Sequence, residues 1–185
     1  MRRSFKAREY PDLNAVWLWF EFQAALIAEE RGHVLRMLFK QTPAALRPHE
    51  SQFLGLTRPE VDEFFDAHRA ELEMLTMFEL LASTEAILRI DFNIRVADRR
   101  KDSLSRRFRA IRKAVGDKIR INEHILRPMQ EEGVPSGVLA YFRATLKLRH
   151  WLAHGRHWHP KLGQNYAPGD VFDIARALLD TIPLS

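Results

Sequence analysis

Apolar residues recur at helical spacing along most of the chain, and this periodicity restricts the fold more than any other feature. From Leu13 onward, apolar residues stand at positions 16, 20, 24, 27, 34 and 38, mostly three or four residues apart. No segment has the extended alternation of apolar and polar residues that is typical of a half-buried strand. The sequence therefore predicts an all-α bundle of five to six helices.

Prolines, glycines and capping residues mark where these helices begin and end. The first helix is expected over about 12–40, and Thr57–Glu60 has the spacing of a capping box that starts the next helix. Ser136 and Asp170 are expected to cap two later helices, and Gly155 can take the left-handed conformation that closes a helix. There are no repeats or low-complexity tracts, so a single all-helical domain over residues 1–185 is expected.

Composition excludes several classes of protein. The chain of 185 residues has no cysteine, which rules out disulfides, thiolate metal sites, iron–sulfur clusters and a cysteine nucleophile. Charged residues make up 29% of it, and its most apolar stretch, residues 15–28, is too short to span a bilayer. We therefore expect a cytoplasmic protein that has no membrane partner.

Positive charge is concentrated in residues 95–120, the basic segment, which holds eleven basic and three acidic residues. The formal net charge of the whole chain is only +5, so the rest of the chain is slightly acidic. A local excess of this kind suggests a polyanion such as RNA, although a solvated helix face would give the same pattern. The residues expected to contact RNA are Arg99, Arg100, Lys101, Arg106, Arg107, Arg109, Arg112 and Lys113.

The last third of the chain carries a motif that suits phosphate chemistry, Arg149-His150-Trp151-Leu152-Ala153-His154-Gly155. On an ideal helix Arg149 and His154 lie about 140° apart, and we expect both at the helix end rather than on its main apolar stripe. RNA can be cut when its 2′-hydroxyl attacks the adjacent phosphorus. Histidine can move the proton near neutral pH, and arginine can fork onto two phosphate oxygens. This chemistry requires no metal.

Two other interpretations of the motif stay open. Arg149 and His154 can serve only as complements of the helix dipole and as clamps of the following loop. Alternatively, the four histidines at positions 150, 154, 157 and 159 could hold zinc. Residues 133–169 contain no Asp, Glu or Cys, so any carboxylate ligand would have to come from another segment.

The motif from Arg149 to Gly155 resembles the signature of HEPN domains, in which an arginine and a polar residue are followed a few positions later by a histidine. Upstream, Ser83–Phe92 followed by the basic segment is similar to the RiboL-PSP type of HEPN domain. The resemblance covers about residues 60–182, with the helix at about 12–40 as an addition. It implies a HEPN-like helical bundle.

The resemblance also implies an activity, that of a metal-independent endoribonuclease typical of toxin–antitoxin and phage-defence systems. It implies a homodimer in which two motifs form one RNA-cleaving cleft, with no cofactor. Arg149 and His154 would then be the catalytic pair and His150 a supporting residue. Glu85 and Asp91 would orient the motif arginine, although both also stand four residues before an arginine, as in ordinary helix pairs.

An antitoxin or another defence-system protein is the partner that this family implies. Some HEPN toxins carry a tyrosine two residues after the histidine, which a nucleotidyltransferase antitoxin modifies. Arg156 occupies that position, so this form of control is not expected. The alternative function is a non-catalytic helical module that binds RNA or another protein, a role that HEPN domains also have.

Overall fold

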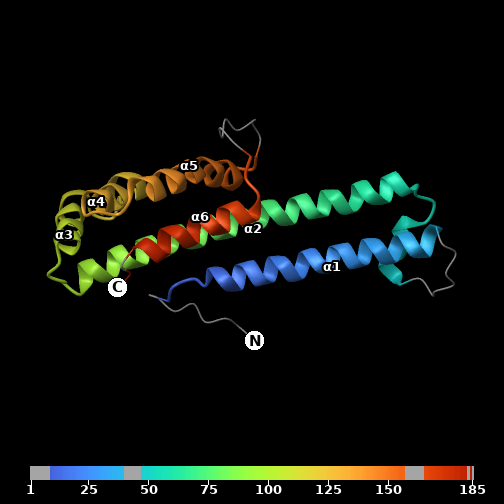
Figure 1. The fold of residues 1–185 in the computed structure, drawn as a ribbon, viewed down its shortest axis with the longest axis horizontal. Helices are drawn as coiled ribbons and strands as arrows, with labels where there is room; N and C mark the ends of the chain where they lie inside the picture. The colour runs from blue at the N-terminus through green and yellow to red at the C-terminus, as the bar shows by residue number, and fades with distance from the viewer. Residues whose placement is uncertain (1–8, 40–46, 157–164, 183, 185) are drawn as a thin grey trace. The chain divides into compact units, whose positions relative to one another are not determined.

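The computed structural model describes residues 9–39, 47–156, 165–182 and 184, and all its regular elements are helical (Figure 1). A 3-10 helix, η1 (Pro48–Phe53), and a short π-helical segment, η2 (Ile121–Leu126), accompany the α-helices. The predicted all-α class is confirmed. None of these helices is both long and apolar enough to cross a membrane. The described chain contains six α-helices, α1 (Leu13–Phe39), α2 (Arg58–Ala97), α3 (Ser103–Val115), α4 (Arg127–Glu131), α5 (Ser136–Ala153) and α6 (Pro168–Thr181).

The helices form two compact units. Asn14–Thr76 make up the hairpin unit, which contains α1, η1 and the first half of α2. The described residues from Met77 onward, together with residues 9–13, make up the C-terminal unit. The division falls inside α2, which is one continuous helix of 40 residues without an internal glycine. Residues 60–76 therefore pack with α1, while the rest of α2 contributes to the C-terminal unit.

Two apolar clusters hold the hairpin unit together. Phe20 and Ala24 of α1 pack on Leu72 of α2. Towards the other end of α1, Val34 packs with a cluster that includes Phe53 of η1, whose ring stacks on Phe65 with centroids 5.5 Å apart. The α1 residues in these clusters recur at helical spacing, as the sequence predicts. Their burial is the main force that joins α1 to α2.

The C-terminal unit has its own core. Phe92 of α2 meets Phe108 of α3, with ring centroids 4.7 Å apart, and both side chains are almost fully buried. On α5 a row of buried residues recurs every three positions, from Leu139 to Leu148. The remaining large buried side chains come from η2, α4 and α6, namely Ile125, Leu126, Met129, Val171 and Leu178.

Most helix ends lie where the sequence predicts, but two caps work differently. Ser136 is the first residue of α5 and makes no capping hydrogen bond. Asp170 is the third residue of α6 rather than its cap, and its carboxylate accepts the Ala167 N–H at 2.8 Å. Glu60 reaches back in the same way, because it accepts both the N–H and the hydroxyl of Thr57 at 2.7 Å. Carboxylates at the third helical position therefore satisfy these free N–H groups.

Candidate active site at the end of α5

Arg149 lies in the last turn of α5 and pairs with Glu85 of α2. Its Nε lies 3.3 Å from Glu85 Oε2, and the two side chains are 33% and 17% exposed. On an ideal helix Arg149 has nearly the same bearing as the buried row that includes Phe142 and Thr145. Arg149 therefore lies on the inward face of α5, and our expectation that it lies off the apolar stripe is wrong.

Glu85 also binds the guanidinium group of a second arginine, Arg89. Arg89 donates from Nε and Nη2 to Glu85 Oε1, at 3.0 and 2.9 Å. The third donor group of Arg89, Nη1, reaches the carbonyl of Ile119 at 3.0 Å and so fixes α2 to the segment before η2. Glu85 and Arg89 are thus a helix pair four residues apart, and the same carboxylate also contacts Arg149. Sequence reasoning noted the pair but did not assign Arg89 to the site.

The guanidinium group of Arg149 has unused hydrogen-bonding capacity. Among the described residues Glu85 is its one ion-pair partner, and the buried Nε makes no hydrogen bond of good geometry. Its Nη1 and Nη2 groups donate to none of the described residues. An arginine held along one edge in this way can present its two terminal amino groups to an oxyanion.

His150 and His154 lie one turn apart, and both are exposed. Their ring centroids are 4.3 Å apart, with an angle of 55° between the ring planes. The backbone beyond α5 fixes this placement, because the N–H of His154 donates to the His150 carbonyl at 3.2 Å. Gly155 then takes a φ of +79°, and the N–H of Arg156 returns to the Trp151 carbonyl at 3.3 Å. The bond from Arg156 to Trp151 is the longer-range hydrogen bond of a Schellman closure, and α5 ends before Gly155 as predicted.

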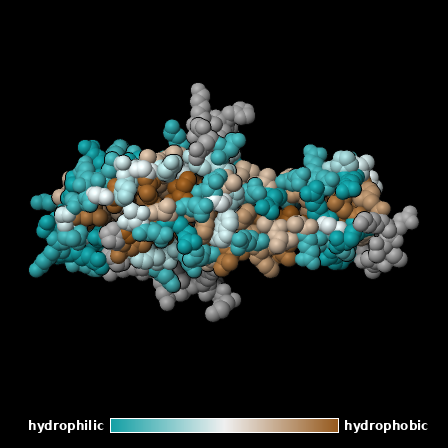
Figure 2. Space-filling model, in the orientation of Figure 1, coloured by the Kyte–Doolittle hydropathy of each residue, from teal (hydrophilic) through white to brown (hydrophobic). Residues whose placement is uncertain are grey.

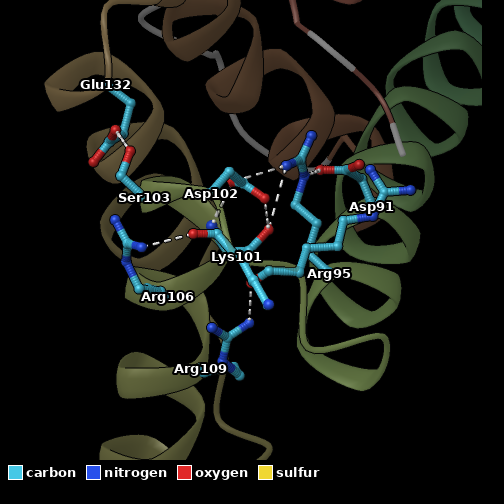
Figure 3. A network of polar contacts seen from close by, with 10 residues as sticks. Asp91, Arg95, Lys101, Asp102, Ser103, Arg106, Arg109 and Glu132 are labelled. Carbon is cyan, nitrogen blue, oxygen red and sulfur yellow. Dashed lines mark hydrogen bonds and ion pairs between the residues drawn. The ribbon is translucent and has the colours of Figure 1, made fainter.

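Asp91, the second predicted acid, has different surroundings. It is fully buried, and its carboxylate accepts Arg95 Nε at 2.8 Å (Figure 3). Arg95 also lies 3.3 Å from Asp102, so it connects the end of α2 to the start of α3. On α2, Asp91 lies six positions beyond Glu85, which is roughly 9 Å along the helix axis. The structure thus brings Glu85 to Arg149 and places Asp91 with Arg95.

Asp102 is the N-cap of α3 within this network. Its carboxylate accepts the N–H and the hydroxyl of Ser105 at 2.9 and 2.7 Å. Desolvation raises the pKa of the Asp102 carboxyl, but the two hydrogen bonds from Ser105 and the charge of Arg95 outweigh it. The pKa of Asp102 is therefore below its ordinary value.

The basic segment divides into compensated and uncompensated charges. Arg107 pairs with Glu131 and Glu132, and Arg112 pairs with Asp117. Arg106 and Arg109 donate at 2.7 Å to the carbonyl groups of Lys101 and Arg100, and neither has an acidic partner among the described residues (Figure 3). The predicted RNA contacts without an acidic partner in the described chain are Arg99, Arg100, Lys101, Arg106, Arg109 and Lys113.

One group of residues with metal-ligand chemistry occurs in the described part of the chain, in the hairpin unit. Glu30, His49 and Glu50 offer ligand atoms within 4.8 Å of one another. The guanidinium of Arg47 already joins the two carboxylates, at 2.8 Å from Glu30 and 2.7 Å from Glu50. The pKa of Glu50 is below its ordinary value, mainly because its carboxylate accepts a hydrogen bond from the backbone N–H of Arg47. Desolvation opposes this effect, and the Arg47 side chain and His33 reinforce it. We therefore describe this group as an ion-pair network that fastens η1 to α1.

Two of the four histidines of the alternative zinc site, His157 and His159, lie outside the described residues. Comparison with known protein families, curated proteins and solved structures gives no match. The last turn of α5 and the residue that follows it carry one guanidinium group and two exposed imidazoles, which are groups that can bind an oxyanion and transfer protons.

Proposed function

We propose that the chain is a metal-independent endoribonuclease of the HEPN type, with Arg149 and His154 as its catalytic residues. One observation carries the proposal. Glu85 engages the Nε edge of Arg149, while the terminal amino groups of that arginine have no partner among the described residues. An inward-facing arginine that is preoriented by a carboxylate can bind a phosphate without first losing side-chain freedom.

The proposed reaction is an internal displacement at phosphorus. The 2′-hydroxyl of one nucleotide loses its proton and attacks the adjacent phosphorus, and the bond to the 5′-oxygen of the next nucleotide breaks. Arg149 holds two non-bridging oxygens and stabilises the charge that develops on them. His154 either takes the proton of the 2′-hydroxyl or gives a proton to the departing 5′-oxygen, and water makes the other of these two transfers. His150 supports the ring of His154 from one turn earlier. The products are a 2′,3′-cyclic phosphate and a 5′-hydroxyl.

We also propose an oligomeric state, an RNA-binding surface and a cellular role. One motif offers few charged groups for a phosphate in transfer, so we propose a homodimer in which two copies of the motif form one cleft. The uncompensated cations of the basic segment would follow the RNA backbone. A role as a toxin or phage-defence effector, together with an antitoxin or defence partner, follows from the resemblance to HEPN domains.

The test is RNA cleavage by the purified full chain and its variants. Arg149→Ala and His154→Ala should abolish cleavage, and His150→Ala should reduce it less, since its proposed role is support. Lys147→Ala removes another cation from α5 and is the matched control, which should cut RNA as the wild type does. Cleavage should survive EDTA, and DNA should be inert because it lacks the 2′-hydroxyl.

Two results would count against this function. If cleavage stops in EDTA, or if DNA is cut as readily as RNA, the proposed mechanism is wrong. A metal-dependent mechanism at the histidines would then take its place. If the wild-type protein cuts no RNA but binds RNA or a protein through the same residues, the chain is a non-catalytic helical module. Mapping cleaved RNA in cells that express the chain with and without its genomic neighbour would identify the target and the partner.

A further inference from the structure

Helix α1 has two apolar faces, and the described residues cover only one of them. The covered face contains Phe20 and Ala24 and packs on α2. The opposite face, here called the apolar stripe, is exposed over the first half of α1, where brown and tan side chains gather in Figure 2. The apolar stripe consists of Leu18, Trp19, Phe22 and Leu26, which are 63%, 47%, 61% and 43% exposed.

The geometry of an ideal helix makes the apolar stripe continuous. Its four residues fall within a sector of about 100°, on the side of α1 turned away from Phe20 and Ala24. A helix that is apolar on opposite faces is typical of one that is covered on both sides. Four adjacent large apolar side chains differ from the scattered exposed leucines that are ordinary on protein surfaces. The stripe therefore indicates an interaction surface.

We infer that the apolar stripe binds the same stripe of a second copy of this chain, with the two α1 helices antiparallel. The charge pattern favours a protein surface of the same kind over RNA or an acidic partner. Between positions 13 and 28 the one charged residue is Glu21, so the stripe itself carries no charge. This surface offers a polyanion no cation to pair with. A second apolar stripe, by contrast, can bind here without removing water from any charged group.

The sequence of α1 is also self-complementary in one antiparallel register. When Phe22 lies at the two-fold axis, Leu18 of one copy is opposite Leu26 of the other. In the same register Trp19 meets the small Ala25 and Glu29 meets Ala15, and no like charges are directly opposed. An isologous contact requires this kind of self-matching.

The exposed area is of the size that such a contact needs. If a large apolar side chain exposes about 200 Å² when fully open, the stripe leaves on the order of 400 Å² uncovered in each chain. Two copies would then bury about 800 Å² from these side chains alone. The surrounding parts of α1 bring the total near the roughly 1,000 Å² expected of a specific interface.

This contact is independent of the proposed ribonuclease dimer, which involves the motif at the end of α5. If both two-fold contacts form, the closed assembly contains four chains, and if only the apolar stripe pairs it contains two. Breaking the stripe contact halves the mass in either case. Phe22→Glu should therefore halve the mass measured by light scattering, while Leu54→Glu, which alters another exposed leucine of the hairpin unit, should leave it unchanged.

The absence of native cysteine makes the register testable by crosslinking. Helix axes 8–10 Å apart place facing Cα atoms roughly 4–5 Å apart, within or near the range of a disulfide. Phe22→Cys should therefore form a disulfide-linked dimer under mild oxidation. Leu18→Cys mixed with Leu26→Cys should link together more readily than either variant alone, and Leu54→Cys should stay unlinked.

The proposal is overturned if Phe22→Glu has the wild-type mass and Phe22→Cys does not crosslink above the Leu54→Cys level. The stripe would then belong to a different protein partner. Crosslinking of Leu18→Cys alone, without the mixed product, would overturn the antiparallel register. RNA cleavage by Phe22→Glu is measured separately, so loss of the contact and loss of the proposed activity remain distinguishable.

Discussion

Glu85 contacts Arg149 through one oxygen and Arg89 through the other. Its Oε2 lies 3.3 Å from Arg149 Nε, and its Oε1 accepts two donors of Arg89 at 2.9 and 3.0 Å. A single carboxylate of α2 thereby aligns an arginine of its own helix and an arginine of α5. The orientation of the proposed phosphate-binding arginine consequently depends on a residue more than sixty positions earlier in the chain.

Glu85→Gln should lower the rate of RNA cleavage by about tenfold to a hundredfold, because a neutral amide no longer aligns Arg149. Single-turnover kinetics should show the loss in the chemical step more than in RNA binding, since the Arg149 charge is still present. Glu73→Gln is the matched control, because Glu73 forms a comparable pair with Arg69 on the same helix at 2.8 Å. Equal effects of the two variants would show that Glu85 has no special role.

The uncompensated cations between α2 and α3 should set the salt dependence of RNA binding. Replacing Arg99, Arg100 and Lys101 with glutamine should weaken binding to all sequences alike. The slope of log affinity against log salt should flatten by about 2, since each contact with single-stranded RNA contributes roughly 0.7. Titrations with a labelled oligonucleotide at several salt concentrations measure this slope.

Arg107→Gln provides the comparison within the basic segment. Arg107 is already paired with Glu131 and Glu132, so its removal should change the slope less than the average residue of the triple variant. If the triple variant keeps the wild-type slope, these cations form a solvated face and do not contact RNA.

The N-cap of α3 should make stability sensitive to acid. The pKa of Asp102 is lowered in the folded chain, so its carboxylate stabilises the fold above the ordinary aspartate pKa. This contribution is lost as the pH falls below that ordinary value towards the lowered folded pKa. Asp102→Ala should cost about 1 kcal/mol at neutral pH, the typical effect of losing a cap.

Asp102→Asn separates the cap from the charge. Asparagine still accepts the Ser105 N–H but does not titrate, so its stability should fall less steeply with acid than that of the wild type. Urea unfolding at neutral and acidic pH, with amide exchange at Ser105, measures both effects. Parallel acid profiles for the wild type and Asp102→Asn would show that Asp102 does not contribute to the acid sensitivity.

Gly155→Ala should disturb the helix end that positions His154. The φ of +79° at Gly155 is unfavourable for alanine, and no atom lies close enough to clash with an added Cβ. The cost should therefore be conformational, about 1 kcal/mol, with reduced RNA cleavage as the ring of His154 moves. Gly137→Ala, at the start of α5 and also free of clashes, should leave cleavage unchanged. Wild-type activity in Gly155→Ala would show that the closure does not position the histidine.

Local patterns were sufficient to predict the helices. Apolar spacing identified the buried face of α1, and Gly155 marked the end of α5, because both depend on residues close in sequence. The cap predicted at Asp170 was wrong because Asp170 stands at the third position of α6, where its carboxylate accepts the Ala167 N–H. Ser136 begins α5 after Pro135 without a capping hydrogen bond, and the first turn of α5 has no acidic residue. The sequence before α6 is compatible with Asp170 either as the cap or as the third helical residue. Only the position at which the helix begins decides between these two roles.

Contacts between distant segments could not be predicted in the same way. Glu85 and Asp91 each precede an arginine by four residues, so local spacing could not show which of them contacts Arg149. The pairing of Arg107 with Glu131 depends on how α3 packs on α4. Glu131 lies outside the basic segment, so the net charge of that segment gives no sign that Arg107 is neutralised. Periodicity identified the covered face of α1, but local spacing could not show that Leu18, Trp19, Phe22 and Leu26 on the opposite face stay exposed.

The arrangement around Glu85 has a consequence for charge balance. Two guanidinium groups share one carboxylate, so this cluster carries one positive charge more than its own side chains neutralise. A singly charged oxyanion bound at Arg149 would make this cluster electrically neutral. Inorganic phosphate or sulfate should therefore raise the melting temperature of the wild type increasingly with concentration, and should do so less in a chain whose residue 149 is alanine.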